Sequence, residues 1–334
     1  MDEQFIRQQG AFKVTADSPI FASTKEFINW KPDTADDDSY ILRAVTLLQD
    51  VLKFHETDDE NSAFLDADLA RLRFGKSVAT GSESGVRYRA ALRRFADQYA
   101  DEPISTVALA ALAISIHYDE SDFAKANKVA SEGRARFPDS IGAKRCSNLI
   151  NQIESTSVQV VSERVWNGDD NRVDVRYQNI DKIWLRLVKF DYRNWKQWGR
   201  HRTPQSLYNE EFKTLLKLPT VKQWSVDLPP TEDFKQRTES ILIDKETKDL
   251  PSGCYVLFSG ITEEFNEDRS EDSKSISVSE IWISDLAVNL RRGTGRNQFE
   301  IQVLDANSGT PIAGAVVDKK AWKYDGRNLS LIHI

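Results

Sequence analysis

Four side chains in one insertion of this sequence are of the types found at binding surfaces. Tyr192, Trp195, Trp198 and Arg200 place three aromatic rings and a guanidinium in a stretch that is rich in lysine and arginine. Aromatic rings and cations stack on sugars and on peptides, so these four residues are the predicted binding surface. In the alternative, which we favour, Trp195 and Trp198 pack the insertion against a neighbouring sheet.

Two glycine-rich stretches resemble catalytic motifs but lack an essential residue. Gly293-Thr-Gly295 has neither the third glycine nor the following helix of a phosphate-binding loop, and a hairpin turn is the better interpretation. Gly81-Ser-Glu-Ser-Gly85 has Glu83 where a nucleophile elbow requires serine. We therefore predict no catalytic residue and no cofactor, and we expect that the chain is not an enzyme.

Possible metal ligands are scattered. His55, His117 and His201 have no partner at ligand spacing, and each is interpreted as a surface or helix-packing residue. The acidic loop from Glu263 to Asp272 has the charge density of a solvated tip. No metal site is predicted.

The composition is that of an ordinary globular protein. The 334 residues are 40% hydrophobic and 29% charged, with a net charge of -7, and this length predicts two or three domains. No basic stripe suited to a phosphate backbone is present, so nucleic acid is not an expected partner. No apolar run approaches the roughly 18 residues of a membrane span, and Met1 leads into Asp2 and Glu3 without the apolar core of a signal peptide.

The first part of the chain, 1–154, has the pattern of helical hairpins. Apolar residues recur at helical spacing from about residue 39, and turns of about 2–5 residues require antiparallel neighbours. Tyr99 with Pro103 and Phe137 with Pro138 recur at an interval slightly longer than the ~34 residues of a tetratricopeptide unit. We predict an α-solenoid of tetratricopeptide-like hairpins. Ser105, Ser121 and Ser140 are its predicted helix caps, and Gly75 is a predicted helix end.

The periodicity then changes from helical to alternating. Residues 155–288 contain strands such as 172–178 and 183–190 with turn residues between them, and a helix is expected only near 208–218. This pattern predicts an antiparallel β-sandwich.

A junction between modules follows, from Ser275 to Val317. Residues 286–290 and 299–303 alternate around a glycine-containing turn, which predicts an antiparallel hairpin, and Ile312 to Val317 is expected to begin a further strand. We assign 289–328 to the start of a second, incomplete β-sandwich. Residues 329–334 resemble a translated sequencing adaptor and are predicted to be a cloning or assembly scar on a truncated product. The alternative is that they form a genuine final strand.

The junction carries a family resemblance. The run from Val278 to Val288, the hairpin, and the run from Gln302 to Val317 resemble the junction of successive macroglobulin domains in bacterial alpha-2-macroglobulin-like proteins of the Bacteroides type. The resemblance implies a scaffold fragment of a protease trap in the periplasm or cell envelope. Its implied partners are downstream macroglobulin domains and, through the full-length protein, proteases.

One departure from the family is visible in the cysteines. The thioester of many family members requires Cys-x-Glu-Gln, whereas Cys146 precedes Ser-Asn-Leu and Cys254 precedes Tyr-Val-Leu. The bait and thioester segments are therefore not expected in this chain.

The alternative function is a cell-surface adhesion protein that presents the Tyr192 to Arg200 insertion to a glycan or peptide.

Overall fold

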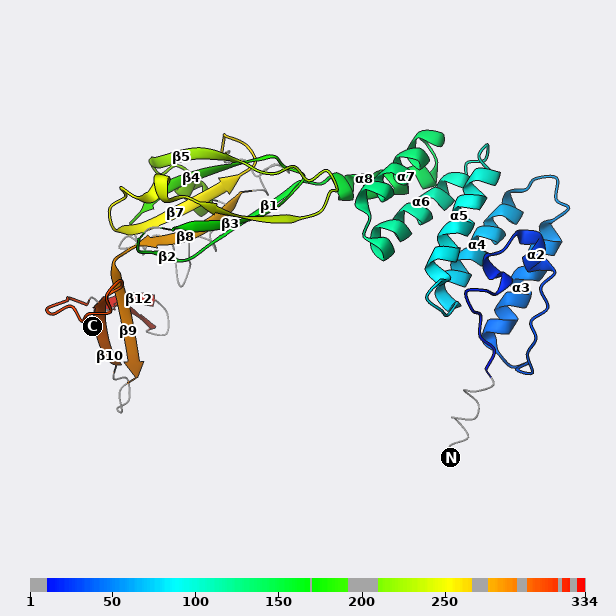
Figure 1. The fold of residues 1–334 in the computed structure, drawn as a ribbon, viewed down its shortest axis with the longest axis horizontal. Coiled ribbons are helices and arrows are strands. Elements are labelled where there is room, and N and C mark those ends of the chain that lie inside the picture. The colour runs from blue at the N-terminus through cyan, green and yellow to red at the C-terminus, as the bar shows by residue number, and fades with distance from the viewer. Residues whose placement is uncertain are drawn as a thin grey trace, which may run out of the picture. The chain divides into compact units, whose positions relative to one another are not determined.

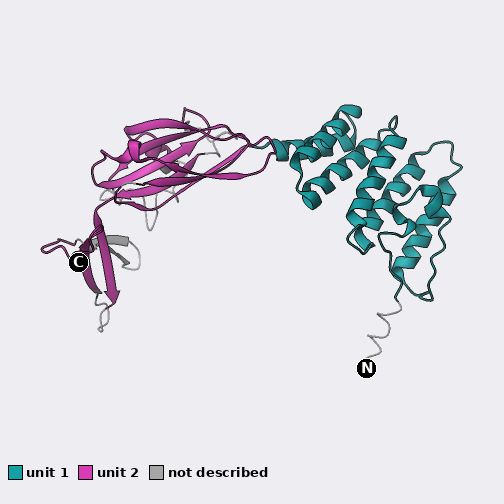
Figure 2. Cartoon of the chain, in the orientation of Figure 1, with its two compact units in different colours: residues 1–155 teal, residues 156–334 magenta. Residues whose placement is uncertain are grey.

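Hydrophobic residues at helical spacing build the first of the two units into which the chain divides, residues 1–155 and 156–334 (Figure 2). The computed structural model describes residues 11–168, 170–191, 210–265, 276–292, 299–317, 320–324 and 329–333. In the first unit each long helix packs on the next in sequence, which gives the predicted row of antiparallel helices (Figure 1). The elements are η1 (Pro19–Phe21), α2 (Thr24–Ile28), α3 (Tyr40–His55), α4 (Ser62–Val78), α5 (Ser84–Gln98), α6 (Ser105–Ser115), η2 (Ile116–Glu120), α7 (Phe123–Arg136) and α8 (Ile141–Glu154). The tetratricopeptide likeness of this row stays a prediction.

Of the three predicted helix caps, only one forms. The Ser140 hydroxyl accepts a hydrogen bond from the Ala143 amide and caps α8. The prediction for Ser105 is wrong, because the residue at the capping position of α6 is Ile104. Ser105 is the first residue of the helix, and its side chain is buried. Ser121 was also wrong, because it ends η2 in the left-handed conformation with φ 54°, and the next residue, Asp122, caps α7.

The predicted helix end at Gly75 is wrong as well. Helix α4 continues to Val78, and Gly75 lies buried within it. A Cβ at this position would lie 2.8 Å from side-chain atoms of both Ile20 and Phe21. The glycine therefore allows the segment around η1 to approach the helix, and the sequence signal for a helix end was in fact a packing requirement.

The second unit contains the predicted β-sandwich. One sheet has the order β1 (Ser157–Ser162), β3 (Arg172–Gln178), β6 (Arg237–Leu242), and the other has the order β2 (Val165–Trp166), β8 (Ser277–Ile283), β7 (Gly253–Gly260), β4 (Lys182–Phe190), β5 (Thr220–Asp227). Their facing sides bury one core, with Trp166, Tyr177 and Leu185 among its members. All pairings are antiparallel except that of β2 with β8, a parallel edge pair that the sequence did not predict.

The outer face of the five-stranded sheet carries a second core. The predicted helix near 208–218 forms as α9 (Glu210–Leu216), and its Phe212, Leu215 and Leu216 pack with Val256 and Phe258 of β7. Strand β7 is covered on both faces, which explains why its residues from Cys254 to Gly260 are buried without alternation. A short helix, α10 (Asp244–Thr247), follows β6.

A separate two-stranded ribbon follows the sandwich. Strands β9 (Leu286–Arg292) and β10 (Phe299–Asp305) pair antiparallel, which confirms the predicted hairpin pairing. β9 spans residue 288, where the sequence analysis placed a module boundary, and the glycines of the turn lie outside the described residues. A further pair, β11 (Lys320–Tyr324) with β12 (Leu329–His333), is antiparallel.

The strand expected from Ile312 to Val317 does not form. After a turn at Asp305, only Pro311 makes an isolated bridge, to Leu304. The chain then turns at Gly314, which has φ 74°. A positive φ at glycine and the missing amide proton of proline both oppose a continuous ladder, so the prediction was wrong for a local reason.

Candidate functional site

The predicted binding surface lies in a part of the chain that the structure does not describe. Tyr192, Trp195, Trp198 and Arg200 lie outside the described residues, between the end of β4 and the start of α9. His201, most of the acidic loop and Gly293-Thr-Gly295 also lie outside them. The binding and packing interpretations of the tryptophans both stay predictions.

The two thiols are buried and neutral. Burial raises the pKa of the Cys146 thiol to about 11, far above the pH at which a thiolate would form. Burial, with the nearby carboxylate of Glu280 as a second cause, raises the pKa of Cys254 to about 12. Both side chains pack as small apolar groups, and at neutral pH each is held as the thiol and not as the more nucleophilic thiolate.

Helix α4 contains a buried ion pair with several further hydrogen-bond partners. Arg71 Nε donates to Asp68 Oδ1 at 2.8 Å, and Arg71 Nη1 donates to the carbonyls of Ile20 and Ala22 at 2.8 and 3.0 Å. Asp68 Oδ2 accepts from the Thr24 hydroxyl at 2.9 Å. Burial lowers the pKa of Arg71, and the ion pair with Asp68 acts against that shift.

The pair of Asp68 and Arg71 was not among the residues predicted from the sequence, although the sequence carries a signal for it. Asp68 and Arg71 stand beside Leu69 and Leu72 on the apolar side of α4, where an unpaired charge would be costly. Three residues apart on a helix, they were positioned to pair with each other. Their additional partners lie more than forty residues away in sequence, which local spacing cannot indicate.

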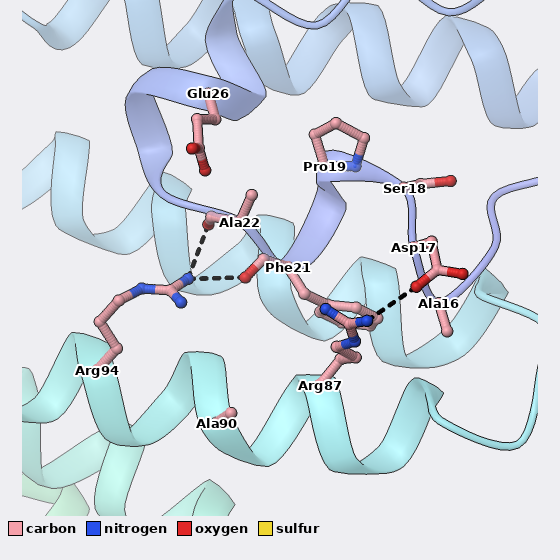
Figure 3. A pocket seen from close by; sticks show the side chains of 10 residues that line it. All are labelled: Ala16, Asp17, Ser18, Pro19, Phe21, Ala22, Glu26, Arg87, Ala90 and Arg94. Carbon is pink, nitrogen blue, oxygen red and sulfur yellow. Dashed lines mark hydrogen bonds and ion pairs between the residues drawn. The ribbon is translucent and has the colours of Figure 1, made fainter.

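A groove of about 370 Å³ lies between the segment 16–26 and α5 (Figure 3). From α5, Arg94 Nη2 donates to the carbonyls of Phe21 and Ala22 at 2.7 and 2.8 Å, and Arg87 forms an ion pair with Asp17 at 2.9 Å. Both arginines thus hold the chain's own N-terminal segment. The ten lining residues supply cations, carboxylates and one serine hydroxyl, and they bring no nucleophile and base together.

A cluster of charges surrounds the π-helical turn η2. Lys76 Nζ lies 2.6 Å from Asp119 Oδ2, and Arg89 Nε lies 2.8 Å from Glu120 Oε1. The hydrogen bond from Lys76, followed by that from Ser115, holds the pKa of Asp119 below its usual range. His117 stacks on Phe123 with ring centroids 4.6 Å apart, and burial lowers its pKa, so it packs as a neutral ring.

In the sandwich, one carboxylate is buried at the edge between β2 and β8. Glu280 Oε1 accepts from Arg164 Nη2 at 2.7 Å and from Trp282 Nε1 at 2.8 Å. The other carboxylate oxygen is buried without a partner among the described residues. The ion pair connects the loop before β2 to strand β8. Burying the Glu280 carboxylate costs free energy, and the pairing with Arg164 offsets part of that cost.

The ribbon of β9 and β10 exposes one apolar face. Leu286, Val288 and Leu290 are each more than half exposed. The register places Val303 opposite Val288 and Ile301 opposite Leu290, so these side chains share a face. A two-stranded ribbon with an exposed apolar face is at best marginally stable alone in water, so this face is suited to packing against another β-layer.

Two further properties hold for the described residues. They contain no group of three or more histidine, cysteine, aspartate or glutamate side chains placed to hold a metal ion. Among them, no helix has both the length and the apolar character to cross a membrane.

No family model and no curated protein matches this chain. Among solved structures, it is similar to native alpha-2-macroglobulin from Escherichia coli spanning domains MG0-NIE-MG1, with 15% identity, a TM-score of 0.33 and coverage of 47% of this chain and 48% of that chain. It is also similar to the NIE-MG1 structure of the same protein, with 14% identity, a TM-score of 0.33 and coverage of 47% and 73%. The match thus spans about half the length of the first structure. TM-scores this low assign neither fold nor family.

Proposed function

We propose that this chain is a scaffold part of a bacterial alpha-2-macroglobulin-like protease inhibitor and has no catalytic role of its own. The support is the junction sequence from Ser275 to Val317, whose hairpin pairing forms as expected, and the order of helical row, sandwich and ribbon along the chain. We further propose that the complete protein acts in the periplasm or at the cell envelope. The finer likeness to Bacteroides-type members rests on the sequence alone.

The single observation that carries the proposal is the uncovered apolar face of the ribbon of β9 and β10. Its leucine and valine side chains would be buried if further β-modules packed there, as in a protein built of successive sandwiches. The exposed face therefore supports a structural role in a larger assembly of macroglobulin domains. The neutral, buried state of Cys146 and Cys254 supports placing any covalent capture of proteases elsewhere.

The test begins with the gene. We expect the genomic reading frame to continue past the codon for Asn328 into further β-sandwich modules. The complete product is then mixed with a protease, and cleavage of a large protein substrate is compared with cleavage of a small peptide substrate. A trap slows cleavage of the large substrate by steric exclusion and leaves cleavage of the small peptide almost unchanged. Residues 1–328 alone should change neither rate of cleavage.

Two results would contradict the proposal. If the protease cleaves the small peptide more slowly when residues 1–328 are added, this fragment inhibits the protease active site directly. A complete product that leaves cleavage of the large substrate unchanged would exclude the trap. Whether Cys-Xaa-Glu-Gln occurs in the continued frame distinguishes covalent from purely steric capture.

A further inference from the structure

The first long helix of the row, α3, exposes a stripe of apolar side chains. Tyr40 is 85% exposed, Leu47 64% and Phe54 75%. Ala44 and Val51 lie between them and are partly exposed. Positions 40, 44, 47, 51 and 54 alternate steps of four and three residues, the spacing of a seam along which two helices pack.

This stripe is separate from the face that α3 already buries. Val45, Gln49 and Leu52 face the inside of the unit, and Gln49 donates to the carbonyls of Phe27 and Trp30 at 2.7 Å each. Helix α3 is the first long helix of the row and contacts α2 and α4 (Figure 1). The end helix of a stacked array normally has a polar outer face, because an apolar one makes arrays associate.

We propose that α3 pairs with α3 of a second copy of this chain in an antiparallel, two-fold symmetric helix pair. In the register that opposes Ala44 to Leu47 of the second copy, Tyr40 opposes Val51 of the second copy, and symmetry repeats both contacts. Ile41 then lies beside Leu48 of the second copy, which widens the apolar seam. Every one of these contacts joins two residues of the same α3 surface, so one patch complements itself.

Charge complementarity selects this register and a second copy as the occupant. Arg43 lies beside Asp50 of the second copy, and symmetry generates the same pair again, so two ion pairs flank the seam. Shifting the register by one heptad would instead bring the two Asp50 carboxylates together. In the single chain, Arg43 is 2.9 Å from Asp38 and Lys53 is 4.0 Å from Asp50, both exposed pairs that exchange partners at little cost.

The seam extends over about two heptads, so the interface is at the small end of specific interfaces, below roughly 1,200 Å². A weak dimer that forms and dissociates with concentration is therefore expected. This inference is independent of the proposed scaffold function, because it concerns the helical unit and the scaffold argument concerns the ribbon.

The test is sedimentation velocity on the full chain between about 1 and about 200 µM. The unchanged chain should shift from monomer toward dimer over this range, and Leu47→Asp should weaken dimerisation at least about tenfold, because it places a charge in the seam. Ile141→Asp, on the exposed side of α8, is the matched control and should leave the shift unchanged, since its side chain is 68% exposed away from the seam.

A charge exchange tests the register. R43D and D50R should each lose self-association, because each places like charges opposite one another. An equal mixture of the two variants should regain it, because every pair in the mixed dimer is then attractive. The proposal is overturned if the unchanged chain stays monomeric throughout, if Leu47→Asp still dimerises, or if mixing the two variants restores nothing. Circular dichroism of each variant confirms that the helices still form.

Discussion

At the scale of single residues, two glycines lie where helices of the row approach each other closely. Gly142, in the first turn of α8, faces α6, where a Cβ would overlap the Thr106 hydroxyl and the backbone of Thr106 and Val107. Gly133 similarly leaves room for Cys146 Sγ, which would lie 2.7 Å from an added Cβ. Two of the helix contacts in the row thus depend on the absence of a side chain.

We expect Gly142→Ala to destabilise the helical unit by about 3 kcal/mol, because the overlapping atoms belong partly to backbone that cannot move aside. Denaturant unfolding followed by helical circular dichroism measures this change. The control is Gly85→Ala in α5, where the nearest atom is the flexible end of Arg89 at 3.3 Å and a gain of roughly 0.5 kcal/mol is expected. Equal effects of the two substitutions would show that α6 and α8 adjust freely.

At the scale of elements, helix ends were harder to predict than helices. The apolar spacing located the long helices of the row, whereas the capping residue depended on the conformation of the chain at each turn. Ser121 was a plausible cap by residue type, yet it has φ 54° at the end of η2, and Asp122 performs the capping. A left-handed residue at a helix end is a position that favours glycine.

Replacing Ser121 by glycine should therefore stabilise the helical unit by about 1 kcal/mol, since glycine adopts the left-handed conformation without the penalty of a Cβ. Replacing Ser140 by alanine should destabilise it by a similar amount, about 1 kcal/mol, because it removes the bond to the Ala143 amide. Thermal unfolding of both variants compares the two signs. A destabilised Ser121→Gly variant would mean that the serine side chain stabilises the turn.

At the scale of the whole molecule, the described parts differ in how completely each is covered. Strands β4 and β7 lie in the middle of the five-stranded sheet, with apolar cores on both faces. The ribbon of β9 and β10 pairs only within itself among the described strands and leaves Val288 and Leu290 exposed. Local stability follows buried apolar area, so the ribbon should open far more often than the sandwich.

Native-state hydrogen exchange should show this difference. We expect the amides of β9 and β10 to exchange at least about a hundredfold faster than those of β4 and β7. Strand β1 is the control, because among the described strands it pairs only with β3 but buries Val160 in the sandwich core, and its exchange should be intermediate. A ribbon as protected as β7 would indicate that its apolar face is already covered.

The sequence by itself determined the kind of each main element and the change from helices to strands, because apolar periodicity reports which faces are buried. It also indicated the hairpin of β9 and β10, since its alternation and its glycines are local. Only the tertiary structure decided that Gly75 packs within a helix, that Asp68 and Arg71 hold the N-terminal segment, and that β2 joins β8 in parallel. These features depend on partners far apart in the chain, whose meeting no local pattern encodes.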